Sequence, residues 1–312
     1  MKKQLSIFLF LFAIATSIAG NGPYSHFQKA MFFCDACGCS ATGGSMGFSS
    51  MLNNNFVGFR YMYQSYTSKD GIFNNSPWVD ENFNTIQAWA RIPVSDKIQI
   101  SALIPYHFHN RERIGGNENI KGLGDITVLA MYTIFETKKD SANFVHKIQT
   151  GGGIKLPTGE YKEANNIGSV NPGFQVGTGS TDFLLMAEYV VKKNNWGLNS
   201  MLNYNIKTEN KKDYQFGNQF NYGSSLFYLY ENRKLKLVPQ AGFAGEVYAE
   251  NTQHGQKVAD TAGNVVFGKF GIEAGRKDLS IGINAMLPIS QNLSGGNVNA
   301  NYRIGINLNY SL

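Results

Sequence analysis

The sequence predicts an all-β protein that folds as a single closed antiparallel transmembrane β-barrel of about 12 strands. Three observations predict this fold. The composition is rich in residues that favour strands and turns, with 34 Gly, 16 Tyr and 22 Phe and only 16% charged residues. Most of the chain consists of short segments in which apolar and polar residues alternate. Long and short connections between these segments also alternate.

Residues 1–19 are expected to be a secretory signal peptide, cleaved after Ala19. Lys2 and Lys3 give a positive start, residues 5–15 are apolar apart from one serine, and residues 17–19 include small residues at the cleavage positions. The apolar run is shorter than the roughly 20 residues that a membrane anchor needs. Without the two signal lysines the formal charge falls from +6 to +4, since 6 − 2 = 4. That charge is too small to indicate nucleic-acid binding.

Residues 20–55 form an N-terminal segment that holds all 3 cysteines, Cys34, Cys37 and Cys39. In an oxidising envelope Cys34 and Cys37 are expected to form a disulfide, with Cys39 left over. The alternative is a site for Cu(I) or Zn, because closely spaced thiolates suit such ions. Both alternatives remain open. The segment is expected to lie in the periplasm or to plug the barrel.

Residues 56–312 form the predicted outer-membrane barrel. Each segment has one apolar face and one polar face, because successive side chains of a strand point to opposite sides. A soluble β-sandwich would show the same alternation, so this pattern alone does not decide the fold. The predicted strands are 56–65, 83–93, 97–109, 122–136, 145–157, 180–191, 196–207, 214–230, 235–249, 264–275, 279–289 and 299–312.

The connections between these segments favour a barrel over a sandwich. The long or moderate connections are 66–82, 110–121, 137–144, 158–179, 208–213, 250–263 and 290–298, and the others are short, so that long and short connections alternate almost throughout. Outer-membrane barrels have long outside loops and tight periplasmic turns. An even number of strands places both termini on the periplasmic side of a Gram-negative-type outer membrane.

Apart from Glu136 at the end of its segment, the charged residues of the predicted strands lie on one face, which we expect to line the lumen. The opposite face is otherwise free of Lys, Arg, Asp and Glu, as expected for contact with outer-membrane lipid, where Arg or Lys costs about 2–4 kcal/mol at the midplane. The predicted lumen-facing residues are Arg60, Arg91, Lys147, Lys155, Lys207, Lys236, Lys269, Arg303, Asp125, Asp182, Glu188, Glu246 and Glu273. Eight basic residues against five acidic ones predict a mild preference for anions.

Three glycine-rich motifs resemble those of a known barrel family. They are GLGDITVLAMY at 122–132, GGGIKLPTGEY at 151–161 and GTGSTDF at 177–183. The resemblance is to the MetA-pathway phenol-degradation family, often called transporters, and it extends from about Gly122 to Leu312. It implies an outer-membrane β-barrel that passes small molecules. The cysteine-containing segment is not part of the family pattern.

The same glycines do not indicate a nucleotide site, because strands surround them and no G-x-x-x-x-G-K-[ST] motif is present. They are expected to relieve crowding inside a narrow barrel. His107 and His109 share the lumen face of one predicted strand. Such a pair is suited to metal binding or base catalysis, but no third member of a site is identifiable. These histidines are therefore more simply explained as wall residues, and we expect no enzyme activity.

Three functional hypotheses follow. The first is a porin-like transporter that passes or binds a small-molecule solute. The second is a metal-binding envelope protein that uses the cysteine segment, with the barrel as support. The third is a surface enzyme that uses His107 and His109. The sequence does not indicate the solute, the oligomeric state or whether the lumen is open.

Overall fold

The computed structural model describes residues 50, 52, 55–71, 75–113, 115–137, 144–166, 170–232 and 235–312. The predicted signal peptide and Cys34, Cys37 and Cys39 lie outside the described residues. Within the described ranges, no helix has the length and apolar character needed to cross a membrane.

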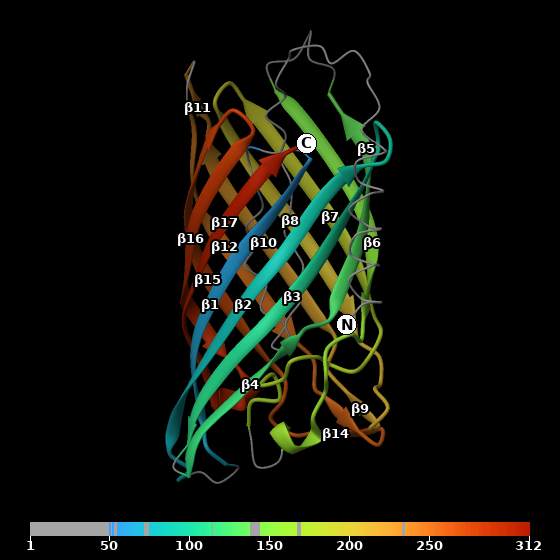
Figure 1. Ribbon diagram of the computed structural model, residues 1–312, viewed down its shortest axis with the longest axis vertical. Coiled ribbons are helices and arrows are strands. Elements are labelled where there is room, and N and C mark those ends of the chain that lie inside the picture. Colours follow the sequence, from blue (N-terminus) through green and yellow to red (C-terminus); the bar gives the residue numbers. More distant parts are fainter. Residues whose placement is uncertain are drawn as a thin grey trace, which may run out of the picture. The chain divides into compact units, whose positions relative to one another are not determined.

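Twelve antiparallel strands form a closed barrel, which confirms the predicted fold class. The barrel closes where β1 pairs with β17 and where β10 pairs with β12, and the strands run diagonally around it (Figure 1). The barrel strands are β1 (Phe56–Lys69), β2 (Trp78–Pro93), β3 (Ile98–Arg113), β5 (Ile126–Glu136), β6 (Val145–Leu156), β7 (Asp182–Lys193), β8 (Trp196–Ile206), β10 (Gln219–Tyr228), β12 (Lys236–Tyr248), β15 (Gly263–Arg276), β16 (Leu279–Asn292) and β17 (Val298–Ser311).

The period-2 pattern of the sequence corresponds to the two faces of the barrel wall. In β1, Phe59 is 63% exposed on the outside, whereas Arg60 and Gln64 are buried inside. The central outward positions of all twelve strands are apolar or uncharged, as contact with lipid requires. Charges on the outer face occur near strand ends, for example at Asp80 and Glu112.

The two ends of the barrel differ in the length of their connections. At the end that holds Phe56 and Ser311, the connections are 94–97, 137–144, 194–195, 229–235 and 277–278. We call this the terminal end. At the opposite end, the loop end, the connections are 70–77, 114–115, 157–181, 207–218, 249–262 and 293–297. The predicted alternation is therefore correct for most connections, although 293–297 is shorter than 137–144 and 229–235 at the terminal end, and it fails at one connection.

The exception is the predicted long connection at 110–121, which is wrong. Here β3 continues to Arg113 and β4 (Gly116–Leu123) returns beside it, so the turn is tight. The first connection is also shorter than predicted, because β1 and β2 extend to Lys69 and Trp78. Outside the lipid a strand needs no apolar face, so these polar extensions lack the alternation that the prediction relied on. Cross-strand ion pairs such as Arg111–Glu118 hold them instead, with the Nη2 to Oε2 distance at 2.7 Å.

The predicted strand 214–230 is also interrupted. Residues 214–215 form β9 (Tyr214–Gln215), which leaves the barrel and pairs with β13 (Thr252–Gln253) in a small sheet completed by β14 (Gln256–Lys257). A Cβ atom at Gly217 would lie 1.9 Å from the Ala249 carbonyl oxygen, so the chain makes this exit where only glycine fits. The remaining short elements are β11 (Tyr230–Glu231) and the 3-10 helices η1 (Glu163–Asn166) and η2 (Ser294–Gly296).

Two apolar clusters lie inside the barrel. One contains residues from β1, β2, β12 and β15–β17, together with Phe174 from the 157–181 connection. The other brings Phe56 and Trp89 together with Leu103, Leu129 and residues of β7 and β8. At this second cluster β6 carries Gly153, where a Cβ atom would lie 2.4 Å from Leu129 Cδ2. This close approach agrees with the prediction that glycine relieves crowding inside the barrel.

Candidate functional site: a connection anchored inside the barrel

The 157–181 connection between β6 and β7 folds into the loop end of the barrel. Its residue Phe174 is fully buried. The ring packs edge-on against Phe83 of β2, with 6.0 Å between centroids, and lies 6.5 Å from the ring of His109 of β3. The Arg111 guanidinium lies 4.3 Å from the Phe174 ring centroid, which is cation–π distance. We call this connection the inner loop.

Asp125 fastens both ends of the inner loop to the barrel wall. The carboxylate accepts hydrogen bonds from the backbone N–H of Gly159 at 2.9 Å and of Thr178 at 2.9 Å. Thr178 also donates its hydroxyl at 2.8 Å. Asp125 is 2% exposed, and such charge-assisted bonds are about twice as strong as neutral ones.

A buried ion-pair network extends from this anchor. Lys155 of β6 lies 2.6 Å from the Asp125 carboxylate and 2.9 Å from the carboxylate of Asp182, measured from Nζ. Lys207, which follows β8, lies 3.2 Å from Asp182. Two lysines and two aspartates sum to zero charge. Burial lowers the pKa of Lys207 from its ordinary value, and the Asp182 charge opposes this shift.

The three glycine-rich motifs meet at this network. Asp125 ends GLGD, Lys155 and Gly159 belong to GGGIKLPTGEY, and Asp182 belongs to GTGSTDF. The two ends of the inner loop come so close that a Cβ atom on Gly177 would lie 2.5 Å from the Gly159 carbonyl. The motif residues thus place and hold the inner loop.

A second anchor joins the inner loop to the extended hairpins. Arg111 of β3 pairs with Glu81 of β2 at 3.3 Å and with Glu118 of β4 at 2.7 Å. Asn171 of the inner loop donates its side-chain amide to the other oxygen of Glu81. Glu81, Arg111 and Asn171 are all buried.

A further buried ion pair joins β17 and β12. Arg303 of β17 pairs with Glu246 of β12 at 2.7 Å and donates a hydrogen bond to the Tyr66 hydroxyl at 3.0 Å from Nε. Tyr248 donates its hydroxyl to Glu246 at 2.5 Å. This pair also sums to zero charge.

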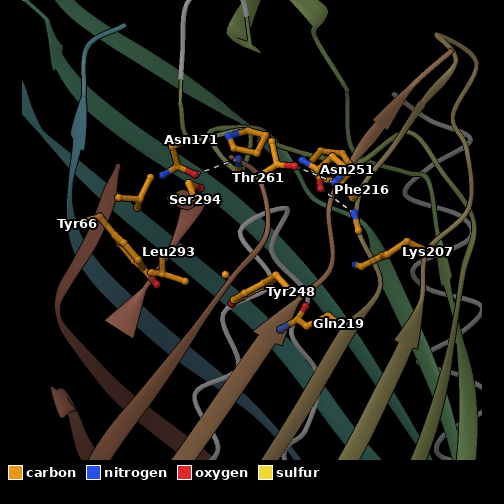
Figure 2. Close-up of a pocket in the computed structure, with 15 residues that line it drawn as sticks. Tyr66, Asn171, Lys207, Phe216, Gln219, Tyr248, Asn251, Thr261, Leu293 and Ser294 are labelled. Carbon is orange, nitrogen blue, oxygen red and sulfur yellow. Dashed lines mark hydrogen bonds between the residues drawn. The ribbon is translucent and has the colours of Figure 1, made fainter. Parts of the chain in front are cut away.

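A cavity of about 70 Å³ remains beside the inner loop at the loop end. Figure 2 shows Asn171, Thr261, Asn251 and Phe216 along its rim, with Tyr66, Leu293, Tyr248, Gln219 and Lys207 lower in the barrel. The cavity has the size of a few water molecules. Next to it, burial raises the pKa of Tyr214, whose hydroxyl accepts a hydrogen bond from Asn251 at 2.6 Å.

Most of the other residues predicted to face the lumen are also buried inside the barrel. Arg60 donates to Gln87 at 2.5 Å and lies over Trp89, while Arg91 lies over the ring of Phe56. Glu188 accepts a hydrogen bond from Asn199. Arg60, Arg91, Lys147, Glu188, Lys269 and Glu273 are buried, and Lys236 is half-buried and pairs with Glu231.

His107 and His109 lie together inside the barrel, with 4.9 Å between ring centroids. His107 Nδ1 bonds to Thr85 Oγ1 at 2.8 Å, and His109 Nδ1 accepts the backbone N–H of Asn84 at 3.1 Å. Phe83 packs edge-on against His109. No group of three potential metal ligands occurs among the described residues.

At the terminal end, two described residues that precede β1 bond to the lumen wall. Ser50 is fully buried and donates its hydroxyl to Glu273 of β15 at 2.7 Å. The backbone N–H of Leu52 donates to the second Glu273 oxygen at 3.3 Å. Ser50 and Leu52 therefore lie against the lumen face of β15.

Sequence reasoning missed the inner loop and its second anchor. Glu81 and Arg111 fell in predicted connections, so neither was considered as a lumen residue. The signal was nonetheless available, because Glu81 continues the inward series of Phe83 and Thr85, and Arg111 continues that of His107 and His109. No signal of this kind marks Phe174, because its burial depends on how the inner loop folds back.

Comparison with known proteins identifies the family. A family model described as "Putative MetA-pathway of phenol degradation" matches residues 81–309. The chain belongs to that family. Among solved structures, it is similar to the COG4313 outer membrane channel from Pseudomonas putida F1, with 13% identity, a TM-score of 0.59 and coverage of 82% of this chain and 95% of that one.

The β domain of the Bordetella autotransporter BrkA is a further similar structure, with 11% identity and a TM-score of 0.49, covering 83% of this chain and 99% of that one. No curated protein matches the chain. The fold is thus that of an outer-membrane β-barrel.

Proposed function

We propose that this protein is an outer-membrane channel that passes a small solute, with the inner loop as its fixed constriction. The observation that carries this proposal is the anchoring of the inner loop inside the barrel by Asp125 and Glu81, beside a cavity at the loop end. The solved structure of similar fold, described as an outer membrane channel, supports the same function.

In the membrane, the terminal end faces the periplasm and the loop end faces outward. The lengths of the connections support this orientation, since outer-membrane barrels have short turns on the periplasmic side. The uncharged outer face contacts the lipid. The barrel acts as a channel rather than an enzyme, with His107 and His109 as part of its wall.

Single-channel recording in planar bilayers tests the proposal. Purified, heat-modifiable barrel is expected to give discrete conductance steps, whereas boiled protein should give none. A folded barrel that never conducts would refute the channel function.

The metal-binding hypothesis for Cys34, Cys37 and Cys39 remains a separate proposal, because these residues lie outside the described ranges. It does not depend on whether the barrel conducts.

A further inference from the structure

A row of uncharged amide side chains leads from the cavity into the barrel. Gln219 of β10 lines the cavity and pairs in register with Asn205 of β8. The next inward pair along the same two strands is Asn221 and Asn203. All four side chains are buried, and we call them the amide ladder.

The ladder has hydrogen-bonding capacity that the described protein groups do not use. Gln219 donates to Asn221 at 2.6 Å, and Asn221 donates to Asn203 at 3.3 Å. Asn205 Nδ2 and Oδ1 and Asn203 Nδ2 are buried without a hydrogen-bond partner among the described protein groups. Buried polar atoms are bonded in the great majority of cases, so such a cluster requires an explanation.

Beyond the ladder, the inward register pair Gly223 and Met201 interrupts the polar series, and uncharged polar side chains resume after it. Ser225 of β10 faces Asn199 of β8 in register, and the Ser225 hydroxyl also lacks a partner among the described protein groups. On the neighbouring strand β12, Gln240 Oε1 is also buried without a hydrogen-bond partner among the described protein groups. Among the described residues, unpartnered polar atoms thus occur on β8, β10 and β12, and also at Asn284 of β16 and Asn309 of β17.

Six buried charges near the entrance are paired with one another. Lys207 and Lys155 pair with Asp182 and Asp125, and Arg303 pairs with Glu246. These groups therefore give the entrance no net charge. An ion that enters would lose hydration water without gaining an opposite charge from them in return. An amide presents both a donor and an acceptor, which suits neutral hydroxyl groups.

We propose that the amide ladder is the solute-binding path of the channel and that it selects small, uncharged, polyhydroxylated solutes. This inference rests on the proposed channel function and replaces the mild anion preference expected from the count of lumen charges. Each rung offers a hydrogen bond in exchange for one that the solute makes with water. Ions receive no such exchange, because no rung is charged.

The test measures how fast liposomes that contain the purified barrel swell in each of three solutes: arabinose, arabinonate and the corresponding amino sugar. The conductance of the same barrel in salt is recorded alongside. Arabinose is expected to enter faster than either charged analogue. The double variant Asn203→Leu and Asn221→Leu keeps similar side-chain volumes but removes the amides. Arabinose entry should then fall by about 2- to 10-fold for each hydrogen bond lost.

Two further variants make the test specific. Asn84→Leu is the matched control, because Asn84 is an amide outside the ladder whose oxygen accepts the exposed Tyr61 hydroxyl. It should leave arabinose entry unchanged. Asn203→Asp places an unpaired carboxylate in the ladder and should slow arabinonate most.

The outcomes separate the two proposals. If salt current flows but arabinonate enters as fast as arabinose, or if the Leu variants have no effect, the ladder does not select the solute. The same conclusion follows if salt current flows and arabinose never enters. If folded barrel passes neither salt nor sugar, the channel function itself is wrong.

Discussion

Replacing Asp125 by Asn is expected to release the inner loop. The change preserves shape, but one carboxylate oxygen becomes an amide nitrogen. Oδ2 accepts the Thr178 N–H, the Thr178 hydroxyl and the Lys155 ammonium, and an NH2 group at that position accepts none of them.

The cost follows from the bonds lost. Two charge-assisted bonds from the inner loop, at about 1.5–3 kcal/mol each, give about 3–6 kcal/mol. Breaking a buried ion pair costs about 3–5 kcal/mol, which is of the same size. Lys155 retains Asp182, so we take the lower part of this range. A loss of about 3 kcal/mol raises the population of the released loop by roughly 100-fold.

Limited trypsin digestion measures that population. Lys162 in the inner loop has a 57% exposed side chain, but Gln175 holds its backbone on both sides. The Lys162 N–H donates to Gln175 Oε1 at 3.1 Å, and the Lys162 carbonyl accepts from Gln175 Nε2 at 2.8 Å. Cleavage there requires local opening, and its rate follows the open population when reclosing is fast.

The Asp125→Asn variant should therefore be cleaved at Lys162 roughly 100-fold faster while it retains heat-modifiable migration on gels. Glu250→Gln is the control, since it breaks only the exposed ion pair with Lys257, and exposed pairs contribute little to stability. Equal cleavage rates in Asp125→Asn and the parent would refute the anchoring role of Asp125.

Three further predictions concern the wall, the terminal end and the cysteines. Leu202 is 50% exposed at an outward position of β8, and Leu202→Arg should destabilise the membrane-inserted barrel by about 2–4 kcal/mol, whereas Leu202→Phe should not. Equal urea unfolding midpoints for the two variants would contradict the assignment of the lipid face. Glu273→Ala removes the hydrogen-bond acceptor of Ser50 and Leu52, and it should raise single-channel conductance if the segment before β1 obstructs the lumen. The control Lys257→Ala should leave the conductance unchanged. An unaltered conductance in both variants would exclude that obstruction. Reduced protein should bind about one Cu(I) per chain, with Cys39→Ser weakening binding as much as Cys34→Ser; one free thiol in native protein and no effect of Cys39→Ser would instead favour the disulfide.

The strands could be predicted from the sequence because lipid imposes a simple rule on every central position. In β1, Phe59 and Arg60 occupy opposite faces, as the alternation requires. Where the wall extends beyond the lipid the rule no longer applies, and the prediction failed for the β3–β4 hairpin. There Arg111 is positioned by individual ion pairs with Glu81 and Glu118. The alternation places Arg111 and Glu81 on the inward face but does not show that these residues pair.

The candidate site was only partly predictable for a related reason. The motifs that contain Asp125, Lys155 and Asp182 are visible in the sequence, and the alternation assigns these residues to the lumen. Their convergence depends on the inner loop turning back until Gly159 and Gly177 touch. That contact joins the first and last parts of the inner loop, so only the three-dimensional structure shows it.

Replacing residues 162–175 of the inner loop by a short Gly-Ser linker tests the central claim most directly. The linker leaves Asp125, Lys155, Asp182 and the barrel strands intact, and it removes Phe174 from the lumen. Single-channel recording should give a clearly larger unit conductance than the parent, with heat-modifiable migration unchanged. A folded variant whose unit conductance equals that of the parent would contradict the claim that the inner loop is the constriction of the channel.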